Sequence, residues 1–288
     1  YRDPQSATLS PLGAIWDAPP VLDATTADGI RHRLWMVADR ARIGQVADAL
    51  RGRQILIADG HHRYETMLGL RDELRPAGRA PGHSGADWGA VFLARAEDPG
   101  LLVLPTHRLV RNLPAFDMAA LRAAAGPAFD VAQSDDADAA AIEARLQREG
   151  DRRVTFAVRG QGDRKTTWLG LKDGVDLSSL GSPALRELDV TVLHSVLLGP
   201  LLGIDAGAMA KQAYLGYTHS TAEALAAVQT GQAQGAFFMN ATRVEDVLQV
   251  CEEGSILPQK STYFQPKLAT GLVMNRMDPD ADVDAVGT

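Results

Sequence analysis

The sequence predicts an α+β fold, in which helices and strands are mixed along the chain. Some segments space their apolar residues along one face of a helix, and others are short apolar runs typical of strands. Glycine and proline separate the two kinds of segment. Hydrophobic residues make up 45% of the 288 residues and charged residues 23%, a composition that supports a sizeable core and excludes overall disorder.

Strand and helix signals follow one another in the first 75 residues. Residues 30–37 partly alternate and predict a strand, and residues 42–50 have the apolar spacing of a helix. Residues 55–58 (Ile-Leu-Ile-Ala) predict a short buried strand. An Asp-Gly pair ends that run, and a helix is expected over residues 61–74.

A β-hairpin is expected next. Residues 89–94 and 101–104 read as strands, and Glu-Asp-Pro-Gly at 97–100 contains the turn residues that would join them. The other predicted strands are 153–158, 165–171 and 235–239, and the other predicted helices are 116–125, 137–149, 184–198, 220–230 and 242–253. The last two helices are expected to begin with capping boxes, formed by Ser220 with Glu223 and by Thr242 with Glu245.

The chain is expected to divide near residues 113 and 180. Its first residue is Tyr1, and the opening residues resemble the end of a strand that enters a turn, so we expect an N-terminal part to precede it. The predicted regions are 1–113, an α/β insertion with a hairpin at 114–180, a helix-rich part at 181–277, and a disordered acidic tail at 278–288.

Charge and composition exclude several classes of function. The net charge of -7 repels phosphate backbones, so nucleic-acid binding is not expected. No apolar run reaches the roughly 18–20 residues of a membrane span. The single cysteine, Cys251, excludes an internal disulfide and a cysteine-based zinc site, and it fits a cytoplasmic location.

The strongest candidate site is the turn between the strand predicted at 55–58 and the helix predicted at 61–74. A helix start exposes unpaired N–H groups and the positive end of the helix dipole, and Gly60 allows a phosphate to approach closely. Arg63, His61 and His62 add donors. The alternative is that Asp59 only caps the helix and the cationic side chains are solvated.

A metal site is a competing interpretation of the same turn. Glu65 lies four residues after His61 and three after His62, so either pair could share a helix face, as in zinc hydrolases. The order of the residues matches no zinc-hydrolase motif, and a third ligand would have to come from a distant histidine. We therefore expect no metal ligands among the site residues.

Two further segments carry candidate binding residues. Thr106, His107 and Arg108 follow the predicted hairpin and could bind the carboxylate or phosphate of a substrate. Residues 258–267 contain two of the five lysines, and Lys260-Ser261-Thr262 is similar to the end of a P-loop but lacks its glycine. Lys260, Ser261 and Lys267 are therefore expected to close over a phosphate or substrate, although solvated loop lysines are an equal alternative.

These segments together resemble a large prokaryotic family known as a numbered domain of unknown function. Its members carry Ala-Asp-Gly-His-His-Arg-Tyr-Glu, here residues 58–65, and Glu-Asp-Pro-Gly-Leu leading to Leu-Pro-Thr-His-Arg-Leu, here 97–109. They also carry Pro-Gln-Lys-Ser-Thr-Tyr-Phe followed by Pro-Lys, here 258–267. The turn itself resembles the phosphate-binding turn of the ParB/sulfiredoxin superfamily, and the relatives include the free-serine kinases.

The resemblance implies a ParB/sulfiredoxin-like nucleotide-binding core in residues 1–113 and a kinase that phosphorylates a small molecule, free L-serine above all. ATP or ADP with Mg²⁺ would be the cofactor, bound by Gly60, His61, His62 and Arg63, with Asp59 and His62 as catalytic residues. In the serine kinases the catalytic base is a glutamate of the N-terminal part, which this chain is expected to lack. A non-catalytic, ParB-like regulatory module and a metal-dependent hydrolase are the alternatives, and a homodimer is left open.

Overall fold

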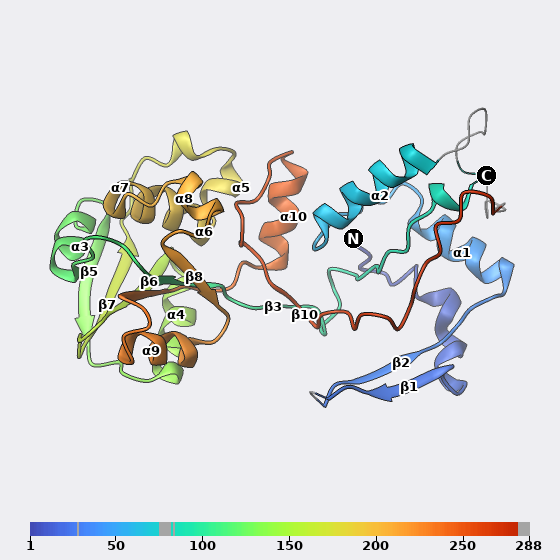
Figure 1. The fold of residues 1–288 in the computed structure, drawn as a ribbon, viewed down its shortest axis with the longest axis horizontal. Coiled ribbons are helices and arrows are strands. Elements are labelled where there is room, and N and C mark those ends of the chain that lie inside the picture. The colour runs from blue at the N-terminus through green and yellow to red at the C-terminus, as the bar shows by residue number, and fades with distance from the viewer. Residues whose placement is uncertain (28, 75–81, 83, 282–288) are drawn as a thin grey trace. The chain divides into compact units, whose positions relative to one another are not determined.

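The structure, a computed structural model, describes residues 1–281 except 28, 75–81 and 83. The chain forms two compact units (Figure 1). Unit 1 comprises Tyr1–Leu101 and Pro266–Thr288, and unit 2 comprises Leu102–Gln265. The boundaries predicted near 113 and 180 both fall within unit 2. Each unit contains helices together with antiparallel strands that pair within that unit, so the predicted α+β class is confirmed.

The described residues of unit 1 form one small sheet and two α-helices. The strands pair antiparallel, so that Leu22 faces Leu34. The second strand and both helices lie where the sequence predicts them. The elements are the 3₁₀ helices η1 (Ser10–Asp17) and η2 (Gly85–Asp87), the strands β1 (Leu22–Thr25) and β2 (Arg31–Leu34), and the helices α1 (Arg40–Leu50) and α2 (His61–Leu74).

Two strands predicted in this unit are wrong. Residues 55–58 and 89–94 run without strand pairing, and residues 102–103 pair elsewhere, so the predicted hairpin is wrong as well. Ile55 is 50% exposed and Phe92 is 67% exposed. A short apolar run becomes a strand only when a neighbouring strand satisfies its N–H and C=O groups, and the described residues offer these two runs none. The turn at 97–100 does form, with a bond from Leu101 N to Asp98 O of 3.0 Å.

A buried carboxylate organises the start of unit 1. Asp3 is fully buried and accepts hydrogen bonds from Ala7 N (3.0 Å), Thr8 N (2.9 Å) and Thr8 Oγ1 (2.6 Å). Arg53 Nη2 lies 3.0 Å from it. Burial alone would raise the pKa of Asp3, but the bonds from Thr8 and Ala7 and the charge of Arg53 outweigh burial and lower it.

Part of the predicted tail is ordered. Ser84 Oγ donates to Pro279 O (2.8 Å), and Gly85 N donates to Ala281 O (3.0 Å). Asp278 lies so close to Gly85 that a side chain there would clash with its carbonyl oxygen. The rest of the predicted tail, residues 282–288, lies outside the described residues.

Unit 2 is built on a six-stranded antiparallel sheet in the order β5-β7-β6-β9-β4-β8. The hairpin predicted for residues 153–171 is confirmed as β6 and β7, in which Thr155 faces Gly170. A separate pair joins β3 to β10. The strands are β3 (Leu102–Val103), β4 (His107–Val110), β5 (Phe129–Ser134), β6 (Thr155–Gly160), β7 (Thr166–Leu171), β8 (Leu215–Thr218), β9 (Gly235–Phe238) and β10 (Phe264–Gln265).

Helices cover both faces of this sheet (Figure 1). One face packs against α4 (Ala139–Gly150) and α9 (Thr221–Gln229), and its core includes Leu109, Trp168 and Phe238. The other face carries the larger core, which includes Val110 and Phe237. Successive side chains of a strand point to opposite faces, so each strand contributes to both cores. The helices of the larger core include α3 (Met118–Ala125), α5 (Pro183–Arg186), α6 (Asp189–Val192), α7 (Gly199–Leu202), α8 (Ala206–Ala210) and α10 (Val244–Glu252).

The single helix predicted over 184–198 is wrong. The structure has α5, α6 and a π-helical segment, η4 (Leu193–Leu198), which runs directly into α7. Pro200 explains the wide turn, because it has no N–H and its ring excludes the carbonyl group one helical turn earlier. The short 3₁₀ helix η3 (Ser178–Leu180) precedes these elements.

The two predicted capping boxes have different outcomes. Ser220 is the N-cap of α9 and accepts from Glu223 N at 3.2 Å, as expected, although Glu223 itself accepts from Thr218. Thr242 is not a cap: its hydroxyl donates to Ser261 O at 2.8 Å. Helix α10 instead begins after Arg243, whose N–H is bound by Asp246.

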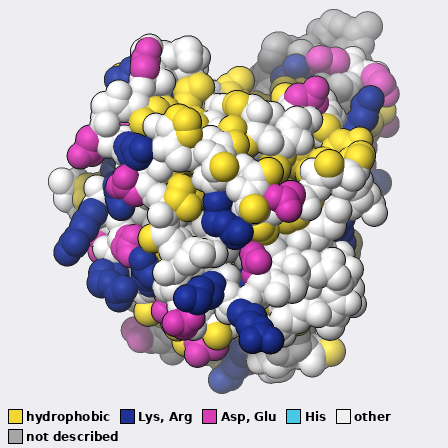
Figure 2. Space-filling view, turned by 90° about the vertical axis from the view of Figure 1, so that its left-hand side faces the viewer, with side chains coloured by type: hydrophobic (Ala, Val, Ile, Leu, Met, Phe, Trp, Pro, Cys, Tyr) yellow, Lys and Arg dark blue, Asp and Glu magenta, His cyan; other side chains and the backbone are white. Residues whose placement is uncertain are grey.

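The surface in Figure 2 carries both signs of charge, with basic and acidic side chains close together and hydrophobic ones among them. This mixture agrees with the modest net charge of -7. In the part of the chain that the structure describes, every helix is too short or too polar to span a bilayer.

Candidate functional site

The turn from Asp59 to Arg63 presents the free start of α2. Gly60 has a φ of +87°, a conformation that favours glycine, and its carbonyl accepts the first helical bond from Tyr64 N at 2.9 Å. The N–H groups of His61, His62 and Arg63 have no acceptor among the described residues. Asp59 does not bond to them, so the capping alternative is not what this structure shows.

Asp59 is instead paired with two cations. Arg63 Nη2 lies 3.3 Å and Lys267 Nζ lies 3.5 Å from Asp59 Oδ2. The Arg63 side chain is 77% exposed and folds over Gly60, where an added Cβ would lie 3.0 Å from Nη2. The turn is therefore a solvent-exposed surface with five potential donors to an anion. Three are backbone amides, and two are cationic side chains that now share one carboxylate.

The two histidines of the turn are both exposed. His62 Nδ1 lies 3.4 Å from Glu65 Oε2, which is the pair considered for a metal. Of the distant histidines that could supply a third ligand, His107 and His194 belong to unit 2, and His83 lies outside the described residues. No set of three or more His, Cys, Asp or Glu side chains converges within the described residues.

In unit 2, strand β4 carries His107 into the interior. His107 is 1% exposed and both its ring nitrogens are bonded. Met239 N donates to Nδ1 (3.4 Å), so Nε2 carries the proton and donates to Thr221 Oγ1 (3.0 Å). Burial, with the charges of Arg108 and His219 adding, lowers the pKa of His107 to about 4. This geometry favours a structural role, and contact with a substrate remains a prediction.

Arg108, the next residue, points to the opposite face of the sheet and is fully buried. Its Nη2 donates to Lys260 O (3.1 Å) and to His194 Nε2 (3.2 Å), and its Nη1 donates to Thr106 O. Its Nε has no partner, and within the described residues no carboxylate pairs with Arg108. Burial lowers the pKa of Arg108 to about 10.

Lys260 and Ser261 form a turn against Arg108. Lys260 has a φ of +59°, unusual for a side chain other than glycine, and its carbonyl is held by Arg108. Its ammonium lies 6.0 Å from the centre of the Tyr217 ring, and the Arg108 guanidinium lies 5.6 Å from the same ring. Ser261 Oγ donates to Pro258 O, so this hydroxyl is already used within the protein.

The structure thus distributes the predicted site residues between the two units. Asp59, Gly60, His61, His62 and Arg63 come together with Lys267 in unit 1. The remaining predicted residues lie in unit 2. Thr106, Lys260 and Ser261 gather around the buried guanidinium of Arg108, and His107 lies on the opposite face of β4.

Sequence reasoning missed the aromatic and imidazole side chains around Arg108. Tyr217 on β8 is the register partner of Arg108. His219 donates from Nδ1 to Pro105 O (2.9 Å) and stacks on Tyr263 at 3.5 Å. His194 on η4 is bonded only through its Nε2 among the described residues. No local pattern marks these residues, because the sheet joins segments more than 80 residues apart.

Three solved structures illustrate the structural similarity of the chain. A conserved hypothetical protein from Pyrococcus furiosus has a TM-score of 0.41 at 17% identity, covering 81% of this chain and 77% of that one. A free serine kinase in complex with AMP has a TM-score of 0.43 at 18% identity, covering 80% of each chain. A variant of a free serine kinase in complex with ADP has a TM-score of 0.41 at 17% identity, covering 80% of this chain and 81% of that one.

The search of the curated proteins gave no match. A family model does match, over residues 1–191, which is about two thirds of the chain and includes the turn at Asp59–Arg63 and strand β4. The chain therefore belongs to the family described as "Protein of unknown function (DUF1015)".

Proposed function

We propose that the chain is a small-molecule kinase that transfers a phosphoryl group from ATP or ADP to a hydroxyl, with free L-serine as the foremost substrate. One observation supports this above the others. The Asp59–Arg63 turn combines three amides without an acceptor in the described residues, a glycine at φ +87°, and two cations that share a single exposed carboxylate. We choose L-serine as the substrate because the sequence of this turn resembles that of the free-serine kinases.

Phosphate binding follows from an exchange of partners. Arg63 and Lys267 now pair with Asp59 at 3.3 and 3.5 Å in solvent, and such exposed pairs contribute about 0–1 kcal/mol. A hydrogen bond to a charged group contributes about 1.5–3 kcal/mol, and a phosphate would also accept from the amides of the helix start. The nucleotide phosphates would therefore displace Asp59 from both cations.

The released carboxylate would then take part in the chemistry. The substrate hydroxyl attacks the terminal phosphorus, the bond from that phosphorus to the bridging oxygen breaks, and ATP leaves as ADP or ADP leaves as AMP. The hydroxyl proton passes to a base, for which Asp59 and His62 are the candidates. One carboxylate beside bound phosphates is a common Mg²⁺ site, so Asp59 fits that ion, which would neutralise phosphate charge when bound.

The cluster in unit 2 is proposed to bind the anionic group of a substrate. Lys260 supplies the exposed cation of this cluster, and Arg108 lies behind it, fully buried. Thr106, His107 and Ser261 would act by positioning these two side chains, because their polar atoms are engaged within the protein.

The test is a product assay with the full chain. Incubation with Mg²⁺, L-serine and either ATP or ADP should yield O-phosphoserine, detected by ³¹P NMR and mass spectrometry. Asp59→Asn should lower turnover more than nucleotide affinity. Nucleotide binding without product, together with nucleotide-dependent dimerisation, would favour a regulatory module. About one zinc per purified chain would favour a hydrolase, and the absence of nucleotide binding would overturn both nucleotide proposals.

A further inference from the structure

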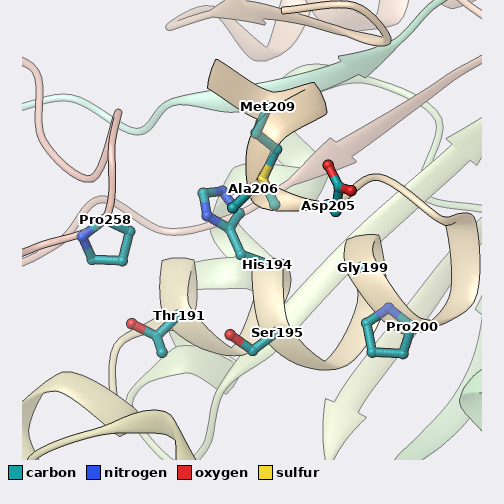
Figure 3. A pocket seen from close by; sticks show the side chains of 9 residues that line it. All are labelled: Thr191, His194, Ser195, Gly199, Pro200, Asp205, Ala206, Met209 and Pro258. Carbon is teal, nitrogen blue, oxygen red and sulfur yellow. The ribbon is translucent and has the colours of Figure 1, made fainter. Parts of the chain in front are cut away.

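A hollow in unit 2 lies beside the π-helical segment η4. None of the residues that line it is among those proposed to bind the nucleotide. Its volume is about 320 Å³. Thr191, His194 and Ser195 line it from one face of α6 and η4, and Asp205, Met209 and Pro258 line the opposite side (Figure 3). All of these residues belong to unit 2. We name this hollow the His194 pocket.

Helical spacing explains why three polar side chains of α6 and η4 face the His194 pocket. Residues three and four apart on a helix share a face, which places Thr191, His194 and Ser195 together. Figure 3 shows them projecting from successive turns, with Gly199 and Pro200 at the following turn. Short π-helical segments in longer helices occur frequently at functional sites.

The protonation of His194 follows from geometry. Arg108 Nη2 lies 3.2 Å from His194 Nε2, and a guanidinium can only donate. Nε2 is therefore the acceptor, and the single ring proton lies on Nδ1. This Nδ1–H has no acceptor among the described residues. Burial and then the charge of Arg108 lower the pKa of His194 to about 3, in agreement with a neutral ring.

Two observations indicate that the His194 pocket suits a ligand that forms hydrogen bonds. Thr191 is 4% exposed, yet its Oγ1 has no partner, and a buried hydroxyl without a partner is costly. Arg108 is fully buried without a carboxylate in the described part of the chain. The imidazole of His194 connects this uncompensated cation to the pocket, so an anion on Nδ1–H would lie near a positive charge in surroundings that screen it weakly.

We propose that the His194 pocket binds a small carboxylate carried on an apolar body. The carboxylate would accept from His194 Nδ1–H and from the hydroxyls of Thr191 and Ser195. The apolar body would pack against Met209 and Pro258. Asp205, whose Oδ1 accepts from Ala208 N at 2.8 Å, lies at the exposed side and would bind an ammonium group if the ligand is an amino acid.

The test compares three ligands of the same shape on the full chain without nucleotide, so its outcome does not depend on the proposed kinase activity. 4-Methylpentanoate carries the carboxylate alone, L-leucine carries carboxylate and ammonium, and 4-methylpentanamide carries neither charge. Titration calorimetry should show the better carboxylate binding at least tenfold more tightly than the amide. The order of the two carboxylates distinguishes a simple acid from an amino acid as the source. Equal binding of the amide, or no binding by any of the three, would overturn the proposal.

Two variants and one NMR experiment test whether the ligand binds in the His194 pocket. Ser195 is exposed, so Ser195→Asp should fold and should weaken carboxylate binding at least tenfold by repulsion. Ser179→Asp, at an exposed serine elsewhere in unit 2, is the matched control and should change nothing. In long-range ¹H–¹⁵N spectra of histidine-labelled protein, the ligand should shift the Nδ1–H signal of His194 and leave the signals of half-buried His32, in unit 1, unchanged. Weakening by both serine variants alike, or an unmoved His194, would contradict the assignment.

Discussion

Cationic side chains dominate both candidate sites, but their surroundings are opposite. Arg63 and Lys267 stand in solvent around Asp59, whereas Arg108 is fully buried and bonded mainly to neutral acceptors. Exposed pairs exchange partners at little cost. A buried cation keeps its desolvation cost, so its hydrogen bonds to neighbouring carbonyl and imidazole groups become essential. The first arrangement suits reversible phosphate binding, and the second suits a fixed positive centre.

Arg63→Ala should weaken ADP binding by about 1–3 kcal/mol, or roughly 5–150-fold, because it removes a charge-assisted contact with phosphate. Arg71→Ala is the matched control, since Arg71 lies on the same helix and pairs with Asp72 away from the turn. Titration calorimetry would measure both affinities. Equal affinities would show that Arg63 is a solvated side chain without a binding role.

Gly60→Ala should destabilise the start of α2 by about 1–2 kcal/mol, because the left-handed backbone at φ +87° is unfavourable for alanine. Its Cβ would also displace the Arg63 guanidinium from its place over the turn. Gly69→Ala is the control: Gly69 lies inside α2 with open space around it, and alanine there should stabilise the helix by about 1 kcal/mol. Hydrogen exchange of the α2 amides should rise for the first variant and fall for the second.

Whole helices were predicted more reliably than strands. Helix α2 begins at the predicted residue, and α9 begins after its predicted cap, because helical bonds and caps are local. The runs at 55–58 and 89–94 have the composition of strands but lack partners in the described structure. The helix predicted over 184–198 is interrupted between α5 and α6, where Leu188 has an extended backbone, and Pro200 disturbs only the turn before it.

Ser220→Ala should destabilise unit 2 by about 0.5–2 kcal/mol, since it removes the cap bond to Glu223 N. Thr242→Ala tests the corrected cap assignment. It should loosen the turn at Pro258–Ser261, which the Thr242 hydroxyl holds through Ser261 O, and leave the start of α10 unchanged. Site-resolved hydrogen exchange separates the two effects, and faster exchange at the start of α10 in Thr242→Ala would restore the original capping box.

Across the whole of unit 2, three buried groups couple stability to pH. The pKa values of His107 and His194 are lowered to about 4 and about 3, so both take up a proton on unfolding between their folded values and about 6.5. Burial, with the charge of Asp246 adding, raises the pKa of Asp189 to about 7, so it releases a proton on unfolding between about 4 and 7. In the pH range that these intervals share, unfolding therefore adds two protons at the histidines and releases one at Asp189, a net uptake of one proton.

Stability should therefore rise with pH between about 4 and 6.5 at about 1.4 kcal/mol per pH unit, and it should be lost as the pH falls through that window. Asp189→Asn removes the opposing group and should roughly double the slope. Hydrogen exchange of the amides of β4 and β6, measured between pH 4.5 and 6.5 and corrected for intrinsic rates, would give the slope. A slope that does not steepen in Asp189→Asn would contradict a protonated Asp189 in the folded protein.

The candidate sites differ in how far sequence could predict them. The turn at Asp59–Arg63 is contiguous, so the helix start and its donors could be predicted from the sequence, although the strand predicted before them is wrong and Lys267 comes from a distant segment. The surroundings of Arg108 come from β4, β8, η4 and the turn at Lys260, which are far apart in the chain. Their convergence depends on sheet order and register, which local patterns do not encode.

Composition and local pattern by themselves determined the α+β class, helix α2, the cap of α9 and the donor-rich turn before α2, because these depend on bonds and propensities within a few residues. Only the tertiary structure decided which apolar runs find a strand partner, that Arg108 is buried without a carboxylate in the described residues, and that His194 presents Nδ1–H to a pocket. Those outcomes depend on which distant segments share a sheet face, since burial and pairing are properties of the assembled layers.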